Sequence, residues 1–468
     1  MKSACTLFLT HLAIIALASC AGPSPFVRTP TALPVSWKNA ANFPTASPSR
    51  DLSRWWQRFN DPTLNRLISE ALAQNPDLAA ASARIRESRA RRDAEIAPLF
   101  PSLGTSASSN SRATNPSSGF SSENTNYSAG LDASWEIDLF GRQRSLIQAA
   151  SANLGTTQEN FYSAQASLSS EIAIAYTNLR ATQAGLEILR RNVATREETY
   201  NLANWRQQAG ESDSLESSQA LSSLEQARAA IPSLEQAAAR SRNLLALLCG
   251  RNPGSLDSLL TPSGKSIPTP PRGLAIGIPA DTLRQRPDVR AAGYSLLAAA
   301  ASTRAADALR YPSLSLSGTL GLSSLSSRKL FNPETATAGA IAGISSPIFD
   351  AGRIRANIQA ADAAEEQAYY AYRSTVLTAL SETEDALIAC RRTAERLATL
   401  EKATAAAREA DTLARLRYDT GEIDFLTVLD AQRSLLSLED SLLTTRADRT
   451  IAFIQLYKAL GGGWSSGS

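Results

Sequence analysis

Two stretches of the sequence decide the fold. Residues 141–152 read GRQRSLIQAASA, and residues 352–363 read GRIRANIQAADA. Eight of their twelve aligned positions are identical at an offset of 211 residues, and the same offset aligns the chain from Pro76 to Gly250 with its second half without a gap. This period is far longer than the roughly 20–50 residues of solenoid repeats. The sequence therefore predicts one domain-sized unit that is written twice.

A very long helix is predicted after each of these glycines. Residues 143–208 and 354–419 contain no proline, and each run of 66 residues would be about 100 Å long as an α-helix. Return helices are predicted over 212–248, interrupted at Pro232, and over 424–460. Leucines recur every seven residues in the second of them, which predicts antiparallel coiled-coil packing; they are Leu429, Leu436 and Leu443.

Each copy is predicted to begin with helices and to continue with strands. The first segments, 63–97 and 281–309, have a helical pattern in which Pro76 and Pro287 each stand at the first turn of a helix. Apolar and polar residues then alternate, which is the period of a strand. Two strands per copy are expected, over about 102–112 and 127–138 and over about 314–322 and 337–348, with polar loops at 109–125 and 323–336.

The predicted strands are long enough to cross a membrane. Each has about 10–13 residues, and a tilted membrane strand needs about 9–11. A soluble sandwich is the alternative, but four strands of small residues have no second sheet to pack on. Aromatic residues near the strand ends would suit the membrane interfaces; they are Phe120, Tyr127, Trp135, Phe140, Phe331 and Phe349.

Four strands cannot close a barrel by themselves. They would leave two open edges, which are not viable in lipid. The chain is therefore expected to oligomerise, so that two, three or four copies give eight, twelve or sixteen strands. The long helices that continue from the strands would then form a hollow cylinder.

The N-terminal residues predict a lipoprotein. A basic start, a short apolar core and small residues are typical of a secretory signal, and Leu17-Ala18-Ser19-Cys20 looks like a bacterial lipobox that places a lipid on Cys20. An ordinary signal peptide with a chance cysteine is the alternative, and Ala21 favours the outer membrane by resemblance. The predicted organisation is a signal peptide (1–19), a lipid-anchored, polyproline-like arm (20–50), repeat 1 (51–250), an equatorial linker (251–280), repeat 2 (281–462) and a tail (463–468).

Composition and charge exclude several classes of function. Of 468 residues, 47 are Lys or Arg and 44 are Asp or Glu, so a net charge of +3 gives no support to nucleic-acid binding. The single histidine, His11, lies in the predicted signal, which leaves none for Ser-His-Asp catalysis or a histidine-bearing zinc site. No enzyme, no metal site and no cofactor besides the lipid on Cys20 is expected. Cys249 and Cys390 are expected to be buried single thiols, with a disulfide between them as the alternative.

Four motifs carry a family resemblance. They are the lipobox, WEIDLFGR at 135–142, RPDVR at 286–290 and YDTGEIDFLTVLDA at 418–431. Together they resemble the TolC-like outer-membrane factors of the OprM/NodT lipoprotein type. The resemblance implies an α+β membrane protein in which a homotrimer shares a twelve-stranded outer-membrane β-barrel, four strands from each chain, continuous with a long α-helical periplasmic barrel.

The same resemblance implies a function. Such proteins are passive exit ducts for drugs and other small molecules in tripartite pumps, with a periplasmic adaptor and an inner-membrane transporter of the resistance–nodulation–division class. A type I protein-secretion duct is the alternative within this class. A lipid-anchored coiled coil of the envelope, without a pore, is the alternative from another class.

The resemblance also assigns site residues. Leu426 would form an apolar constriction and Asp430 a ring of carboxylates at a periplasmic gate, and Tyr418 would belong to the gate's side-chain network. Gly210 and Gly421 would be docking turns for the adaptor. The alternatives are a solvated Asp430 early in a helix, a tyrosine packed between helices, and glycines needed only for turns. Some relatives have a second acid and an arginine where this chain has Thr427 and Ile423, so a two-acid ring is not implied.

Overall fold

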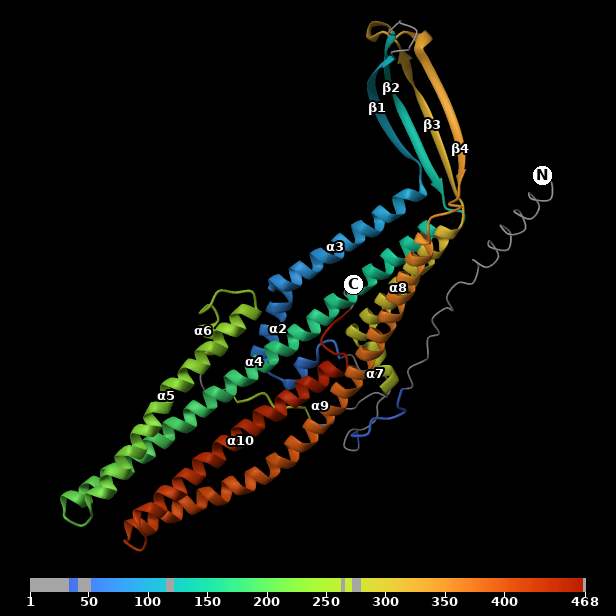
Figure 1. Cartoon of the computed structure of the whole chain (residues 1–468). Coiled ribbons are helices and arrows are strands. Elements are labelled where there is room, and N and C mark those ends of the chain that lie inside the picture. The colour runs from blue at the N-terminus through green and yellow to red at the C-terminus, as the bar shows by residue number, and fades with distance from the viewer. Residues whose placement is uncertain (1–32, 41–51, 115–121, 262–265, 272–278, 466–468) are drawn as a thin grey trace. The chain divides into compact units, whose positions relative to one another are not determined.

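The computed structural model describes residues 33–40, 52–114, 122–261, 266–271 and 279–465. The same order of elements occurs twice along the chain, as Figure 1 shows. The first set is α2 (Pro62–Gln74), α3 (Pro76–Ile96), β1 (Ser102–Thr114), β2 (Ser122–Ile137), α4 (Arg142–Gln208) and α5 (Ser214–Leu248). The second set is α7 (Pro279–Gln285), α8 (Pro287–Asp307), β3 (Ser313–Ser324), β4 (Ala336–Ser345), α9 (Arg353–Asp419) and α10 (Phe425–Ala459). This order confirms the predicted duplication, with strands and very long helices in each copy.

Two compact units form, and each contains residues from both copies. The described residues of Arg84–Gln158 and Ala291–Arg373 make up unit 1. Those of Ala32–Ala83, Glu159–Arg290 and Ser374–Ser468 make up unit 2. The predicted division into two successive repeat domains stays a prediction.

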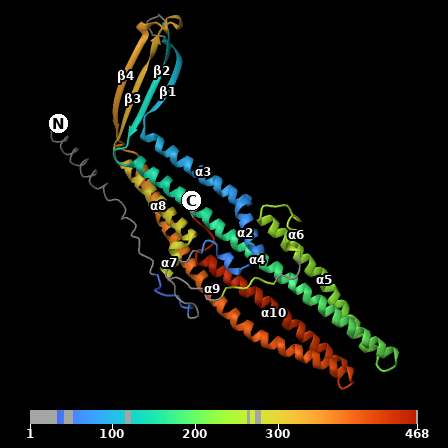
Figure 2. The ribbon, with the colours of Figure 1, turned by 180° about the vertical axis from the view of Figure 1, so that it is seen from behind.

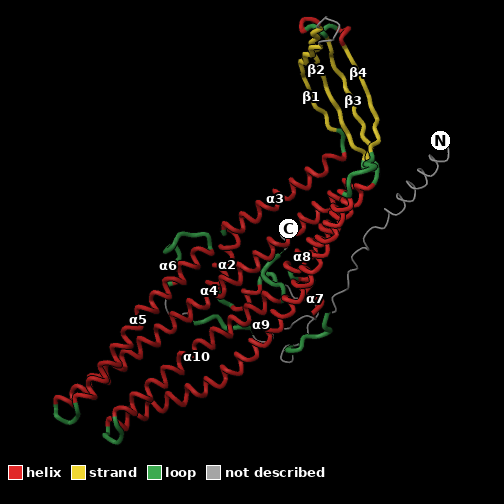
Figure 3. The backbone as a smooth tube through the Cα atoms, viewed as in Figure 1, coloured by secondary structure: helices red, strands yellow, loops and turns green. Residues whose placement is uncertain are grey.

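Unit 1 holds one antiparallel sheet with the strand order β1-β2-β3-β4, drawn in yellow in Figure 3. Its register places apolar residues of neighbouring strands opposite one another, such as Leu131 opposite Leu320. Serine, asparagine and acidic residues alternate with them and share the other face. The apolar face is exposed in the single chain, where Leu103 is 72% and Ile344 is 78% accessible.

The strand register is duplicated together with the sequence. Leu103 lies opposite Ala133, and Leu314 lies opposite Ile344, which are the same positions shifted by 211 residues. The helices begin at Pro76 and Pro287 as predicted.

The predicted loops are too long. Strand β1 continues to Thr114 and β2 begins at Ser122, so the prediction of a loop over 109–125 is wrong at both ends. The polar side chains of this region fit a strand because they bond across the pair, as Thr125 does to Ser111 at 3.2 Å. The loop predicted at 323–336 is shorter as well and contains the 3₁₀ turns η4 (Ser327–Lys329) and η5 (Pro333–Thr335).

Unit 2 holds two helical hairpins, α5 with the part of α4 from Glu159 on and α10 with the part of α9 from Ser374 on, and Figure 2 shows these helices from behind. Each long helix has 67 residues. The predicted interruption at Pro232 is wrong, because α5 runs through this residue. Ion pairs hold α5 to α4 on either side of the proline; they are Arg228–Glu197 at 2.9 Å and Arg190–Glu235 at 3.0 Å.

The described part of the N-terminal arm is attached to unit 2. Trp37 is buried, and Glu384 on α9 accepts hydrogen bonds from the backbone N–H groups of Lys38 (2.6 Å) and Asn39 (3.1 Å). A single carboxylate thus pairs with consecutive backbone donors, and the extended, polyproline-like arm over 20–50 stays a prediction. The signal peptide, Cys20 and Phe120 lie outside the described residues.

The C-terminal tail also packs into unit 2. The N–H of Gly463 donates to the carbonyl of Leu52 at 3.0 Å, and a Cβ on Gly463 would lie 2.7 Å from Ser169 Oγ. The ring of Trp464 stacks on Tyr162, with 4.8 Å between centroids. The start of the predicted tail is thus part of the packed fold.

Cys249 and Cys390 are free and buried, which confirms the prediction of single thiols. Within the described residues, no helix has both the length and the apolar character needed to cross a membrane.

Candidate functional site at the turns of the helical hairpins

The two hairpins of unit 2 end in turns of the same design. In each turn a glycine has a positive φ, +77° at Gly210 and +75° at Gly421. The next N–H closes the helix by donating back to a carbonyl five residues earlier, from Glu211 to Arg206 and from Glu422 to Arg417. An aspartate three residues after each glycine then caps the return helix. The repeated Gly-Glu-x-Asp sequence therefore dictates both turns.

Tyr418 connects the two hairpins just before the second turn. Its side chain is 4% exposed, and its hydroxyl donates to Glu216 Oε2 on α5 at 3.3 Å. The guanidinium of Arg206 on α4 lies 4.6 Å from the ring centroid and donates to the carbonyls of Tyr418 and Asp419 at 3.2 and 3.3 Å. Burial raises the pKa of Tyr418. The phenol is therefore neutral over the physiological range and acts as a hydrogen-bond donor.

A small apolar cluster supports this network. The ring of Tyr418 lies 5.6 Å from that of Phe425, between centroids. The buried members of the cluster come from all four helices; they are Ala203, Ala220, Ala414, Tyr418, Phe425, Val428 and Leu429. The turns are thus attached to each other by packing as well as by polar contacts.

Leu426 and Asp430 lie on the free side of α10. Leu426 is 52% exposed although its neighbours Phe425 and Val428 are buried. Asp430 is one turn further along and is exposed, with Arg433 Nη1 at 3.7 Å from its carboxylate. The structure brings Tyr418 into the cluster and leaves Leu426 and Asp430 outside it.

A buried cation lies deeper between the hairpins. Arg196 on α4 is 7% exposed and donates through Nη1 to the carbonyl and the hydroxyl of Ser223 on α5. Burial, followed by the charge of Arg433, lowers its pKa. Gln432 on α10 donates to Thr199 at 3.2 Å in the same region. These contacts tie α4 to both return helices.

The sequence did not indicate Arg206, Glu216 or Arg196. Arg206 lies in the last turn of α4, where a cation is favoured by the helix dipole, and that was its only local signal. Thr427 and Ile423 are uncharged and have other roles; Thr427 bonds to the capping Asp424, and Ile423 packs against the apolar cluster.

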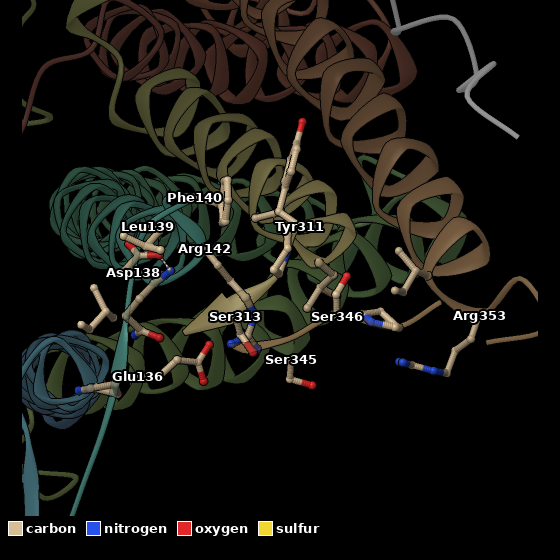
Figure 4. Close-up of a pocket in the computed structure, with 18 residues that line it drawn as sticks. Glu136, Asp138, Leu139, Phe140, Arg142, Tyr311, Ser313, Ser345, Ser346 and Arg353 are labelled. Atoms are coloured by element: carbon tan, nitrogen blue, oxygen red, sulfur yellow. Dashed lines mark hydrogen bonds between the residues drawn. The ribbon is translucent and has the colours of Figure 1, made fainter. Parts of the chain in front are cut away.

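A second concave site lies in unit 1, where the strands meet the helices. Figure 4 shows this cavity of about 490 Å³, with Glu136, Arg142, Tyr311 and Arg353 among its labelled residues. Asp138 in its wall accepts hydrogen bonds from the N–H groups of Gln143 and Arg144. Partial burial opposes these bonds, but they lower the pKa of Asp138 overall. The residues that line the cavity therefore include fixed charges and a helix cap.

Metal coordination has no support in the part of the chain that the structure describes. No group of three or more His, Cys, Asp or Glu residues there could hold a metal ion.

The chain thus combines an exposed apolar sheet face, helices of 67 residues and paired glycine turns. The chain belongs to the outer membrane efflux protein family, whose model matches residues 67–251 and 278–462. It is an outer-membrane efflux channel protein, and its TolC-like fold contains the predicted duplication.

Curated relatives cover nearly the whole chain. The toluene efflux pump outer membrane protein TtgF of Pseudomonas putida is 32% identical over 98% of both chains. The pyoverdine export outer membrane protein OpmQ of Pseudomonas aeruginosa is 31% identical over 97% of this chain and 96% of its own.

Solved structures agree with this assignment. The outer-membrane channel OprN is 33% identical and superposes with a TM-score of 0.89 over 95% of this chain and 99% of its own. The open state of the MtrE outer membrane channel of Neisseria gonorrhoeae is 31% identical, with a TM-score of 0.82 over 95% and 98% of the two chains.

Proposed function

We propose that the chain is the exit duct of a tripartite efflux pump and works as a homotrimer with a twelve-stranded barrel. The sheet carries this proposal. It is four-stranded, its apolar face is exposed, and β1 and β4 have no strand partner on their outer sides among the described residues. In a bilayer such edges have to be paired, because lipid offers no hydrogen bonds. Three copies supply twelve strands and close the edges.

The partners are a periplasmic adaptor and an inner-membrane transporter of the resistance–nodulation–division class. Gly210 and Gly421 serve as adaptor docking turns. An added Cβ at either glycine would meet no atom within 4 Å, so a partner can approach the backbone closely. Relatives named for toluene efflux and pyoverdine export support small organic molecules as the cargo.

The periplasmic gate consists of Tyr418, Leu426 and Asp430. Tyr418 holds the two hairpins together, and release of its contacts would separate them. Leu426 and Asp430 are free to face the duct, where three copies would give an apolar constriction and a ring of carboxylates. The duct is not an enzyme, and the lipid on Cys20 is its only attached group.

The function is tested by dye efflux from cells. Cells that lack the gene are compared with cells in which it is restored, and with cells that carry a chain whose turn residues Gly210 and Gly421 are both replaced by Leu. Restoration should speed the loss of a lipophilic dye, and the double variant should remain at the level of the deletion. If cells that lack the gene lose the dye as fast as restored cells but no longer release a secreted protein, the chain is instead a type I secretion duct.

A further inference from the structure

The cavity at the junction of strands and helices in unit 1 contains two arginines. Its volume of about 490 Å³ lies within the roughly 300–1,000 Å³ of small-molecule sites. All of its lining residues belong to unit 1, where the strands end and the long helices begin. Figure 4 shows both arginines, Arg142 and Arg353, among these residues.

The duplicated Gly-Arg sequence places these two side chains. Gly141 and Gly352 have positive φ angles, of +78° and +83°. Each glycine is followed by an arginine that is the first residue of a long helix, Arg142 of α4 and Arg353 of α9. The two repeats therefore each supply one guanidinium to the same cavity.

Neither guanidinium has an ion-pair or hydrogen-bond partner among the residues that the structure describes. The nearby Arg144, by contrast, binds Asp138 Oδ2 through Nε at 3.1 Å. Three hydroxyls of the cavity lining also form no hydrogen bond to a described residue; they belong to Ser313, Ser345 and Ser346. A guanidinium presents a planar fork of N–H donors that fits a carboxylate or a phosphate. The cavity thus offers several unused donors suited to an anionic group.

The backbone N–H groups at the starts of the two long helices are already in use. Asp138 accepts hydrogen bonds from the N–H groups of Gln143 and Arg144 on α4. Asp350 accepts one from the N–H of Ile354 on α9 at 2.8 Å. Attraction for an anion therefore comes from the arginine side chains and not from the helix ends.

The free charges of the cavity lining are mostly positive. Its acidic residues are Glu136 and Asp138. Asp138 is occupied by the cap of α4 and by Arg144. Glu136 is exposed and has no ion-pair partner in the described part of the chain. Two guanidiniums therefore act against one carboxylate, which favours an anion over a cation.

The strand register shows on which face of the sheet the cavity lies. Glu136 lies opposite Ser315, and Ser313 lies opposite Ser345. Opposed residues share a face, and so do residues two apart along a strand, so these four residues are all on the polar face. Ile137 is on the other, apolar face. In a membrane barrel the apolar face contacts lipid and the polar face lines the interior.

We infer that Arg142 and Arg353 form an anion-binding site in the wall of the duct, where they hold the carboxylate or phosphate group of small organic cargo. The inference rests on the proposed exit duct, because only a closed barrel makes the polar face a duct wall. In a homotrimer the site occurs three times, at the level where the barrel meets the helices. It gives the duct a preference for anionic cargo over neutral cargo of the same size.

Fluorine NMR with a small carboxylate tests the site directly. The full chain in detergent is titrated with 4-fluorobenzoate and, as the uncharged probe, with 4-fluorobenzamide. Arg142→Gln and Arg353→Gln should each weaken binding of 4-fluorobenzoate about tenfold, because a hydrogen bond to a charged group contributes on the order of that factor. Glu136→Gln should strengthen this binding, because it removes the opposing carboxylate. None of the three variants should change the weak binding of 4-fluorobenzamide.

Arg355→Gln is the matched control for these titrations. It removes the same charge two residues further along α9, and Arg355 is exposed and outside the cavity lining. Equal affinity of the parent chain and both cavity variants would overturn the inference, and so would equal weakening by Arg355→Gln. Inorganic phosphate should displace the probe. Displacement by phosphatidylglycerol vesicles but not by phosphate would identify a lipid headgroup as the ligand and overturn the assignment to cargo.

Efflux from cells separates this inference from the proposed function. The chain with both Arg142→Gln and Arg353→Gln is compared with the parent chain for loss of anionic carboxyfluorescein and of neutral Nile red. The double variant should slow the loss of carboxyfluorescein several-fold and leave that of Nile red unchanged. Equal slowing of both dyes, or of neither, would overturn the inference and leave the exit-duct function standing. A parent chain that speeds the loss of neither dye would contradict the proposed function, and the inference with it.

Discussion

At the scale of single residues, the hairpin turns depend on contacts that no local pattern shows. Tyr418 was predicted as a network member from its motif, but its partners Glu216 and Arg206 are 202 and 212 residues away. Their types are ordinary for helix ends, so only the folded chain identifies them. Leu426 and Asp430 were easier to select, because the motif around them is long and specific.

The first prediction concerns the hydroxyl of Tyr418. Tyr418→Phe removes the hydrogen bond to Glu216 and keeps the ring under Arg206. Loss of one such bond costs about 1 kcal/mol, which is roughly a fivefold change in an equilibrium. The open probability in single-channel recordings should rise by about that factor, and Arg206→Ala should have a larger effect.

Tyr200→Phe is the matched control, since Tyr200 packs against the same cluster. If both Tyr418→Phe and Arg206→Ala conduct like the parent chain, Tyr418 has no part in the gate.

The second prediction concerns the two thiols. Burial raises the pKa of Cys249 to about 11 and that of Cys390 to about 12. At pH 8 the thiolate fraction is then on the order of one in a thousand or less. Peptide mass spectrometry should find neither cysteine modified by maleimide in the folded protein and both modified in denaturant. Rapid modification of Cys390 before unfolding would contradict its buried position.

At the scale of elements, most helices and strands were predicted from the spacing of apolar residues and prolines along the sequence. Strict alternation located β2 and β3, and long proline-free runs located α4 and α9 to within a residue at each end. The failures have a common physical cause. A proline locally favours a break in a helix, and polar residues locally favour a loop. Pairing with a neighbouring element outweighs these preferences at Pro232 and at the polar ends of β1 and β2.

The third prediction compares two turn glycines with the same backbone conformation. Gly421 and Gly461 have φ of +75° and +79°. A Cβ at Gly421 meets nothing within 4 Å, but at Gly461 it would be 2.9 Å from the carbonyl carbon of Gln285. Gly421→Leu should therefore cost only the roughly 1–2 kcal/mol of a left-handed residue and leave a stable oligomer.

Adaptor capture and thermal unfolding together check this expectation. Gly421→Leu should lose the adaptor with little change in unfolding temperature, whereas Gly461→Ala should lower that temperature strongly. Full pump activity of Gly421→Leu as a stable trimer would refute the docking role of this turn.

The fourth prediction concerns acid stability at the start of α8. Arg286 is buried and donates to Asp288 and Glu382, both at 2.6 Å. Burial alone would raise the pKa of Asp288, but hydrogen bonds and the charge of Arg286 lower it below its ordinary value of 3.8. The carboxylate therefore adds stability above about pH 4, and this stability is lost as the pH falls through the lowered pKa.

Asp288→Asn should accordingly lower the unfolding temperature at pH 7 and narrow the difference between pH 7 and pH 3. Asp77→Asn, at the equivalent position of repeat 1, is the control, because an asparagine replaces the arginine there. Identical pH profiles of the two variants would show that the Arg286 network does not contribute.

At the scale of the whole molecule, the duplication was the most informative sequence feature. It predicted the order of all the repeated elements and a sheet of four strands. It did not reveal that each compact unit contains residues of both repeats, because that depends on how the two long helices are divided between the units. Nor did it reveal that the side chains of α3 and α8 differ in their exposure, because both helices are rich in alanine.

The packed tail has a consequence for how far the chain can be shortened. Gly463 and Trp464 fill space beside Ser169 and Tyr162 on the long helix α4. Removing residues 463–468 would leave this space unfilled and would take away the ring that stacks on Tyr162. The shortened chain should therefore unfold at a lower temperature, because an unfilled space in a packed region is destabilising.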